Sequence, residues 1–342
     1  MNSPRRILIV QTAFLGDVVL TLPLVQVLHR TFPGAEIDIL AIPEVSEVLQ
    51  NHPAIHRVIA YDKHKTHRGL AGMVSVSRML RSIRYDLALV PHRSMRSAIV
   101  VAMSRIPVRI GFTTSAGRFL FTTLVRYDKN AHEIERNLAF LKPLGAEQHG
   151  KEFPSLYPSR DDLAAVDKFL ANNAIDGGTK LVAIAPGSVW NTKRWLPERF
   201  AGVADALISA GLRVVLVGGM DDLALCKEIA AMVRSGNVAV AAGTFSILQS
   251  AELIRRCDTL VTNDSAPLHL AVAMRTRVVA VFGATVPAFG FAPYGERDRV
   301  IETMGLSCRP CSIHGGDVCP IRTFDCMKRI SVGEVLATVL QA

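Results

Sequence analysis

The sequence predicts an α/β protein made of two doubly wound, Rossmann-like domains. Short apolar runs alternate with runs of helical length along the whole chain, a pattern typical of parallel sheets covered by helices. The 342 residues also exceed the size at which one hydrophobic core keeps growing. A polar segment from Gly145 to Ser159 contains Pro154 and Pro158 and separates two sets of strands. We therefore expect a first domain at residues 1–150, a linker at 151–160, a second domain at 161–330 and a final helix within 331–342.

Each expected strand is a short run rich in Val, Ile, Leu and Ala. In the first domain, strands are expected at Arg6–Val10, Glu36–Ala41, Arg57–Ala60, Asp86–Val90 and Arg109–Phe112, with helices at Val18–Thr31, Val45–Asn51, Ala71–Arg84 and Glu133–Leu144. In the second domain, strands are expected at Leu181–Ala185, Arg213–Val217, Val238–Ala241, Thr259–Thr262 and Val278–Phe282, with helices at Glu198–Ala210, after Pro267 and at Val332–Gln341.

The positive charge of the chain lies entirely in its first half. Residues 1–160 hold 21 Lys and Arg against 12 Asp and Glu, whereas residues 161–342 hold 18 of each, so the net +9 belongs to the first part. Such an excess implies a polyanionic partner: a nucleic acid, an anionic membrane face or a phosphorylated glycolipid. Two basic clusters are candidates to bind such a partner. The first contains Lys63, Lys65 and Arg68, and the second contains Arg93 and Arg96. The alternative interpretation is that both clusters are ordinary solvated loops.

The N-terminus resembles a targeting segment only superficially. Arg5 and Arg6 precede an apolar stretch, but Gln11 and Asp17 interrupt it and no clean cleavage site follows. No run approaches the 18 or more apolar residues of a membrane-spanning helix. We expect a cytoplasmic protein with transient contact at the inner face of the inner membrane.

The segment after the strand at 259–262 combines several ligand-binding groups. Asp264 and Ser265 occupy the position of a helix N-cap before Pro267, and His269 follows one turn later. The free N–H groups and the dipole at such a helix end favour an anion. A capped helix with a core histidine is the structural alternative.

A second polar segment follows the strand at 181–185. It is rich in hydroxyl and cationic groups, and both tryptophans of the chain lie in it. Fixed positive charge there suits a diphosphate, whose negative charge grows as a leaving group departs. The candidate groups are Ser188, Thr192, Lys193 and Arg194.

A third segment follows the first strand. Gly16 permits a tight turn and Asp17 lies at or near the N-cap of the next helix. Taken alone, Asp17 is better explained as a structural cap than as a functional residue.

Together these motifs resemble glycosyltransferase family 9, the heptosyltransferases of the lipopolysaccharide inner core. The matching elements are Leu15-Gly16-Asp17 with Leu22-Pro23, then Pro186-Gly187 with Thr192-Lys193-Arg194-Trp195, then Asn263-Asp264-Ser265 with His269. The Lys-Arg-Trp element is more similar to heptosyltransferase II than to heptosyltransferase I. The resemblance implies the GT-B architecture, in which two Rossmann-like domains face a central cleft and the last helix crosses back to the first domain.

The resemblance also implies an activity and roles for residues. The N-terminal domain would bind the lipopolysaccharide core or lipid A precursor, and the C-terminal domain would bind ADP-heptose. Asp17 matches the base of an inverting transfer, and its place near a helix N-terminus predicts that it stays ionised. Lys193 matches the phosphate-binding lysine, aided by Ser188, Thr192 and Arg194, while Asp264 matches the aspartate on the heptose hydroxyls, with Gly16, Ser265 and His269 nearby. No metal or cofactor is required.

The nucleotide pocket is less clearly marked. Asp222 follows Gly218-Gly219 at a strand end, where an acidic side chain suits ribose hydroxyls, although a helix cap is equally compatible. Phe245 follows the next strand and is a candidate to flank the adenine, with a core position as the alternative.

Four of the six cysteines are clustered as Cys308, Cys311, Cys319 and Cys326. Only the first pair has the two-residue spacing common in zinc sites, so we expect reduced packing thiols and keep a tetrathiolate zinc site as the alternative. The cluster is not expected to take part in catalysis.

Two other functions remain open at this point. A family 9 transferase with another donor or acceptor would carry the same motifs. A nucleic-acid-binding protein would explain the basic half, but no RNP-type aromatic motif, zinc-finger spacing or aromatic interleaving of the basic clusters supports it. We therefore expect no nucleic-acid partner.

Overall fold

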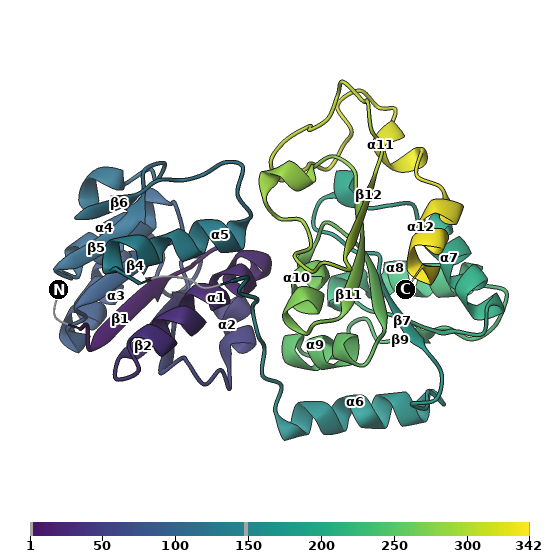
Figure 1. The fold of residues 1–342 in the computed structure, drawn as a ribbon, viewed down its shortest axis with the longest axis horizontal. Coiled ribbons are helices and arrows are strands. Elements are labelled where there is room, and N and C mark those ends of the chain that lie inside the picture. Colours follow the sequence, from purple (N-terminus) through teal and green to yellow (C-terminus); the bar gives the residue numbers. More distant parts are fainter. Residues whose placement is uncertain (1–2, 147–149, 342) are drawn as a thin grey trace. The chain divides into compact units, whose positions relative to one another are not determined.

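The computed structural model describes residues 3–146 and 150–341, which form two compact units (Figure 1). Unit 1 comprises Met1–Tyr157 and unit 2 comprises Pro158–Ala342. Residues 147–149, next to the predicted end of the first domain, and residue 342, the end of the predicted final segment, lie outside the described residues.

Unit 1 is built on six parallel strands in the order β3-β2-β1-β4-β5-β6. Strand β1 lies at the centre, and the order reverses between β1 and β4, as in a doubly wound fold. The elements are β1 (Arg6–Val10), α1 (Leu15–Thr31), β2 (Glu36–Ala41), α2 (Pro43–Ser46), η1 (Glu47–Leu49), β3 (Arg57–Ala60), α3 (Gly69–Ile83), β4 (Leu87–Val90), α4 (Met95–Met103), β5 (Val108–Phe112), η2 (Arg118–Leu120), β6 (Thr123–Val125), α5 (Glu133–Leu138) and η3 (Ala139–Leu144).

Unit 2 repeats this plan with six parallel strands in the order β12-β11-β10-β7-β8-β9. Its elements are α6 (Arg160–Asn172), β7 (Leu181–Ala185), η4 (Asn191–Lys193), α7 (Pro197–Ser209), β8 (Arg213–Leu216), η5 (Met220–Asp222), α8 (Leu223–Met232), β9 (Ala239–Val240), α9 (Ile247–Arg255), β10 (Thr259–Asn263), α10 (Ala266–Ala273), β11 (Arg277–Phe282), η6 (Pro287–Phe289), β12 (Arg299–Glu302), α11 (Asp325–Lys328) and α12 (Val332–Leu340). The predicted α/β fold with two doubly wound sheets is thereby confirmed.

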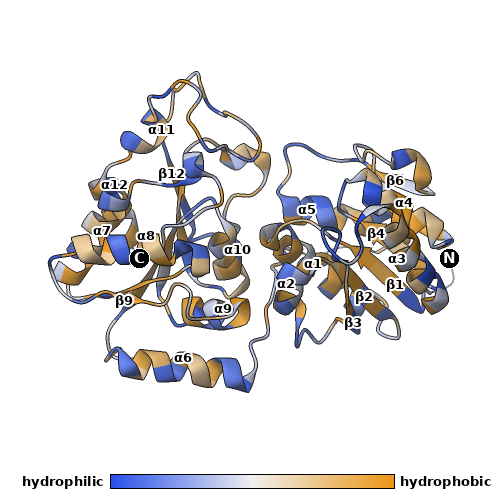
Figure 2. Ribbon diagram, turned by 180° about the vertical axis from the view of Figure 1, so that it is seen from behind, coloured by the Kyte–Doolittle hydropathy of each residue, from blue (hydrophilic) through white to orange (hydrophobic). Residues whose placement is uncertain are grey.

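The core of each unit lies on both faces of its sheet. The central strands β1, β7, β10 and β11 are buried along nearly their whole length, because helices cover both faces of a parallel sheet. Figure 2 shows the strands as predominantly apolar and the polar residues gathered on helices and loops around them. Within the described part of the chain, no helix is both long and apolar enough to cross a membrane.

The predicted strands are found within about two residues of their expected bounds, and the main differences lie at the edges. The edge strands β6 and β12 were not predicted, because they are short and carry few buried apolar residues. Helix α4 was not predicted because the arginines around its start resemble a loop. The helix expected at 45–51 is instead a short helix followed by a 3₁₀ turn. Gly16 lies inside α1 and outside the set of glycines with positive φ, so the expected tight turn is not formed there.

The C-terminal helix α12 belongs to unit 2. Ser331 and Glu334 form a capping box at its start, with Glu334 N–H donating to Ser331 Oγ at 3.2 Å. The Arg277 guanidinium donates to the carbonyls of Val339 and Thr338 at 2.9 and 2.6 Å, which ties the end of the helix to β11. The helix thus packs within unit 2, and its return toward the first domain stays a prediction.

Candidate active site

All three sequence motifs follow the strands at which the sheet order reverses. In unit 2, β7 and β10 are neighbours, and the polar segments at 186–196 and 264–265 follow their carboxyl ends. In unit 1, β1 and β4 are neighbours, and Asp17 and Arg93 follow them. Doubly wound sheets bind ligands in the crevice at this point.

In unit 2 the segments after β7 and β10 meet through an ion pair. Lys193 Nζ lies 2.8 Å from Asp264 Oδ2, and the two side chains are 14% and 9% exposed. Thr285, which follows β11, donates from Oγ1 to the same carboxylate oxygen at 2.6 Å. Sequence reasoning chose Lys193 and Asp264 but missed Thr285. The pair places an ammonium group and a carboxylate side by side at the edge of the sheet.

Asn263 and Trp195 hold the Lys193 segment in place. Asn263 Oδ1 accepts from Trp195 N–H at 2.9 Å, and its amide donates to the Pro186 carbonyl at 2.8 Å. Trp195 is 1% exposed, its indole N–H donates to the Met327 carbonyl at 3.2 Å, and its ring packs edge-on against Phe200. Trp195 is therefore a structural anchor of the segment.

The cysteine-rich segment borders the same loop, which the sequence did not indicate. Thr192 and Gly316 exchange two hydrogen bonds of 2.8 and 2.9 Å. A Cβ on Gly315, whose φ is +87°, would lie 2.9 Å from Lys193 Cγ. Arg309 secures this segment by donating to the Thr285 and Thr303 carbonyls at 2.8 and 2.7 Å.

Two other residues of the Lys193 segment, Arg194 and Ser188, are joined by a hydrogen bond. Arg194 donates from Nε to the Ser188 carbonyl at 2.7 Å, and Ser188 is buried. Arg194 therefore bridges its own loop in this structure, while Thr192 binds Gly316.

Helix α10 starts where the sequence predicted, at Ser265. Ser265 is the N-cap residue, but its side chain makes no capping bond and instead lies 3.3 Å from Thr262 Oγ1. Ser265 therefore leaves the start of α10 without a side-chain cap. Pro267 has no N–H, and Leu268 N–H donates to the Ser265 carbonyl at 3.1 Å, so this helix start offers an anion fewer N–H groups than an ordinary helix does. His269 is buried, with its ring edge toward Phe291.

Asp222 links the loops that follow β7 and β8. Its carboxylate accepts from Gly219 N–H at 3.0 Å and lies so close to Gly187 that a Cβ there would be 2.0 Å from Oδ1. The structure thus gives Asp222 a capping role, and its contact with ribose stays a prediction. Phe245 packs edge-on against Phe169 of α6 at 5.2 Å between ring centroids, and its contact with adenine also stays a prediction.

In unit 1, Asp17 is the third residue of α1. Phe14 occupies the N-cap position. Burial, together with the nearby Glu133, raises the pKa of Asp17 to about 7, while backbone N–H groups and Arg93 oppose the shift. This corrects the expectation that the helix N-terminus keeps the group fully ionised.

Charged and aromatic groups that the sequence did not single out surround Asp17. Glu133 forms a buried ion pair with Arg136, 2.9 Å between NH1 and Oε2, and burial raises the pKa of Glu133. The ring of Tyr127 lies between two guanidinium groups, 4.4 Å from Arg93 and 4.7 Å from Arg136. The position of Glu133 in the first turn of α5 gave no signal of a site, because its ion pair with Arg136 resembles an ordinary helical pair and Asp17 is distant along the chain.

The five predicted acceptor-binding cations divide into two groups. Lys63 donates to the Thr12 carbonyl at 2.8 Å, and burial together with Arg96 lowers its pKa. Arg96 donates to the Tyr61 hydroxyl and the His67 carbonyl, each at 2.6 Å. These two hold loops of unit 1 together, whereas Lys65, Arg68 and Arg93 are exposed.

The six cysteines are described as free thiols. Cys226 and Cys257 lie in the core, and burial raises the pKa of Cys326 to about 11, with Cys311 adding to the shift. Across residues 3–146 and 150–341, no three potential ligands are grouped as a metal site would require. The dispensability of the cluster for catalysis stays a prediction.

Two doubly wound units with polar motifs at both points of reversal define the GT-B class of nucleotide-sugar glycosyltransferases. The family model described as "Glycosyltransferase family 9 (heptosyltransferase)" matches residues 73–316, and the chain belongs to this family.

Named relatives and a solved structure agree with this assignment. The chain is 30% identical to lipopolysaccharide heptosyltransferase 3 of Escherichia coli, over 80% of this chain and 82% of that one. It is 28% identical to lipopolysaccharide heptosyltransferase 2 of Salmonella typhimurium, over 87% and 88% of the two chains. A crystal structure of a family 9 glycosyl transferase from Veillonella parvula superposes with a TM-score of 0.90 at 25% identity, covering 98% of this chain and 96% of that chain.

Proposed function

We propose that this protein transfers a heptose from ADP-heptose to the inner core of lipopolysaccharide, with inversion at the anomeric carbon. The observation that carries the proposal is the Lys193–Asp264 ion pair at the point where the sheet order of unit 2 reverses. An ammonium group beside a carboxylate suits a sugar diphosphate, because one charge neutralises phosphate and the other accepts hydrogen bonds from sugar hydroxyls. The names of the relatives support heptose as the sugar and lipopolysaccharide as the acceptor.

On the donor side, Lys193 stabilises the departing diphosphate. Its ammonium group exchanges Asp264 for a phosphate oxygen when the donor binds, and Asp264 then turns to the heptose hydroxyls. The start of α10 adds the positive end of its helix dipole and the Ala266 N–H toward the phosphates. Ser188, Thr192, Arg194 and His269 complete the donor contacts, while Asp222 and Phe245 are assigned to ribose and adenine. No metal or cofactor is needed, because the lysine and the helix end neutralise the leaving group.

On the acceptor side, Asp17 acts as the general base. The acceptor hydroxyl attacks the anomeric carbon, its proton passes to the Asp17 carboxylate, and the bond to the diphosphate breaks with its electron pair leaving on ADP. A carboxylate with a pKa near 7 is a much stronger base than an ordinary aspartate while still being about half ionised at neutral pH.

We assign the acceptor's anionic groups to the exposed cations Lys65, Arg68 and Arg93, which lie on the strongly basic unit. The acceptor is membrane-borne, so we place the protein in the cytoplasm, peripherally at the inner membrane. Nucleic acid is not a partner in this proposal.

A donor screen tests the proposal. Purified protein is incubated with core-truncated lipopolysaccharide and with ADP-heptose, ADP-glucose, UDP-glucose or GDP-mannose, and release of the nucleoside diphosphate is followed. We expect release that depends on acceptor and is fastest with ADP-heptose. Faster turnover of another donor would identify a family 9 transferase of different specificity and would overturn the assignment of heptose.

A further inference from the structure

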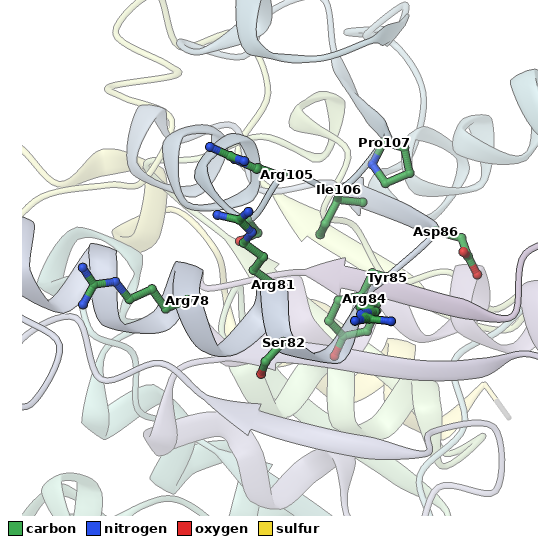
Figure 3. A pocket seen from close by; sticks show the side chains of 10 residues that line it. Arg78, Arg81, Ser82, Arg84, Tyr85, Asp86, Arg105, Ile106 and Pro107 are labelled. Atoms are coloured by element: carbon green, nitrogen blue, oxygen red, sulfur yellow. The ribbon is translucent and has the colours of Figure 1, made fainter.

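Unit 1 carries a cationic hollow on the edge of its sheet opposite to Asp17. The hollow has a volume of about 780 Å³ and lies where α3 leads into β4 and α4 leads into β5 (Figure 3). Asp17 and Arg93 follow the carboxyl ends of β1 and β4, whereas the hollow lies at the amino ends of β4 and β5 in the same parallel sheet. The hollow is therefore separate from the proposed transfer site. It is lined by four arginines, Arg78, Arg81, Arg84 and Arg105.

The positive charge of the hollow is not neutralised within the protein. In the described residues the four guanidinium groups make no ion pair and no side-chain hydrogen bond. The one acidic lining residue, Asp86, already accepts the backbone N–H groups of Arg5 and Arg6 at 2.8 and 3.0 Å. Each helix C-terminus adds about half a negative charge, so roughly two positive charges remain after Asp86 and the two helix ends are counted.

Two of the arginines occupy backbone positions that favour another residue. Arg84 and Arg105, just beyond the last turns of α3 and α4, have φ of 61° and 57°. Glycine or asparagine is preferred at such positions, because other side chains strain the left-handed backbone. The chain thus keeps arginine where local conformation alone would favour glycine.

We propose that this hollow docks unit 1 onto an anionic membrane, with phospholipid phosphates between the arginines. The occupant follows from charge complementarity, since clusters of Lys and Arg are attracted to the negative surface of such a membrane. Nucleic acid fits less well, because the one aromatic lining residue, Tyr85, is buried and its hydroxyl donates to Asp38. The choice of a membrane rests on the proposed lipid-borne acceptor.

Vesicle binding tests the docking surface apart from catalysis. The variant with Arg78, Arg81, Arg84 and Arg105 all changed to Gln is compared with a control that loses the same charge from exposed lysines of unit 2, in which Lys168, Lys180, Lys227 and Lys328 become Gln. Both are sedimented with phosphatidylglycerol-containing vesicles and with pure phosphatidylcholine vesicles. We expect the arginine variant to lose about a hundredfold in partitioning to the anionic vesicles only, and the control to lose less than about threefold.

Transfer to a deacylated, water-soluble acceptor should be equal in the wild type and the arginine variant, so a failure of docking is distinguishable from a failure of the proposed activity. A variant in which the four arginines become Lys keeps the positive charge and should still bind the anionic vesicles. It keeps the proposal testable if the Gln variant does not fold. Four results would overturn the proposal. The lysine control could lose as much binding as the arginine variant, or binding could be equal on anionic and neutral vesicles. Millimolar inorganic pyrophosphate alone could displace the protein from the vesicles, or the protein could bind nucleic acid but not vesicles.

Discussion

At the scale of single residues, the surroundings of two side chains, Asp17 and Lys193, change their proton affinity or their ion pairing. Asp17 is half-buried near Glu133, and desolvation together with the Glu133 carboxylate raises its pKa to about 7. Lys193 is held against Asp264 by a salt bridge of 2.8 Å in which both side chains are largely shielded from water. Shielding strengthens each interaction, because a charge in a low-dielectric site is less screened than one at the surface.

The raised pKa of Asp17 predicts the pH dependence of transfer. A base must be deprotonated, so kcat/KM should fall about tenfold per pH unit below pH 7 and level off above it. Changing Glu133 to Gln removes a neighbouring negative charge, lowers the Asp17 pKa and should move the acidic limb to lower pH. The control Glu44→Gln removes an exposed charge from α2 and should leave the profile in place. A limb that stays near pH 7 in the Glu133 variant would show that Glu133 does not tune the base.

Asp17→Asn should fold and bind donor but lose roughly a hundredfold or more in turnover. The folded-state pKa lies above that of an unfolded aspartate, so ionisation of Asp17 destabilises the fold as pH rises through the range between the two values. The Asn variant should therefore melt no lower than the wild type at pH 8, as measured by calorimetry. Near-normal turnover in this well-folded variant would remove Asp17 from the role of base.

Lys193→Ala should lower kcat as well as donor affinity, because negative charge on the leaving diphosphate grows toward the transition state. We expect a loss of roughly a hundredfold in kcat, measured with saturating ADP-heptose. The matched change Lys180→Ala, at an exposed lysine just before β7, should have no effect. If only the donor KM rises, Lys193 binds the ground state and does not assist departure.

At the scale of elements, the segment 308–316 is the unexpected neighbour of the donor loop. It is fixed by Arg309 and joined to Thr192 through Gly316. Its cysteines remain a separate question, and we expect Cys308→Ser and Cys311→Ser to leave transfer unchanged. Metal analysis of the purified protein checks this: stoichiometric zinc that is lost in the serine variants, together with loss of activity, would contradict it.

Gly315 tests whether this segment shapes the donor site. In Gly315→Ala the new methyl group would lie 2.9 Å from Lys193 Cγ, so the lysine must shift and the donor KM should rise several-fold. Gly305→Ala is the matched control, since Gly305 also has a positive φ, +76°, but nothing within 4 Å of the added Cβ. Both variants carry the backbone strain, and only the first should affect the donor KM in steady-state kinetics. Equal effects would mean that the strain alone is responsible.

The sequence predicts an element well where a long, continuous apolar run marks it, and poorly where the pattern is short. Buried strands such as β1, β7 and β11 are continuous apolar runs and were predicted almost residue for residue. Lys193 and Asp264 were predicted from polar segments that follow such strands. Thr285 and Arg309 were missed, because their partners are brought near only by the fold. Glu133 and Arg136 were missed because an ion pair three residues apart on a helix resembles an ordinary surface pair, and only the fold brings them near Asp17. Lys63 lies in a loop as predicted, whereas Arg96 lies in the first turn of α4. The sequence could not show that the two charges bind the protein's own backbone and Tyr61.

At the scale of the whole molecule, the net charge of +9 in residues 1–160 suits an anionic, membrane-borne acceptor. Changing Lys65, Arg68 and Arg93 to Gln should raise the acceptor KM and leave the donor KM nearly unchanged. The difference from the wild type should shrink as salt rises, since exposed charges are screened over about 8 Å at physiological ionic strength. The control with Lys168, Lys180 and Lys227 changed to Gln should behave as the wild type. An unchanged acceptor KM would place the acceptor's anionic groups elsewhere.

The central claim, inverting transfer of heptose from ADP-heptose to the lipopolysaccharide core, is tested most directly by the product. Core-truncated lipopolysaccharide is treated with ADP-heptose and either wild-type protein or Asp17→Asn, and the purified product is analysed by mass spectrometry and NMR. The account predicts one added heptose with the wild type, in the anomeric configuration opposite to that of the donor, and little product with the variant. A product without added heptose, or a heptose attached with retained configuration, would contradict it.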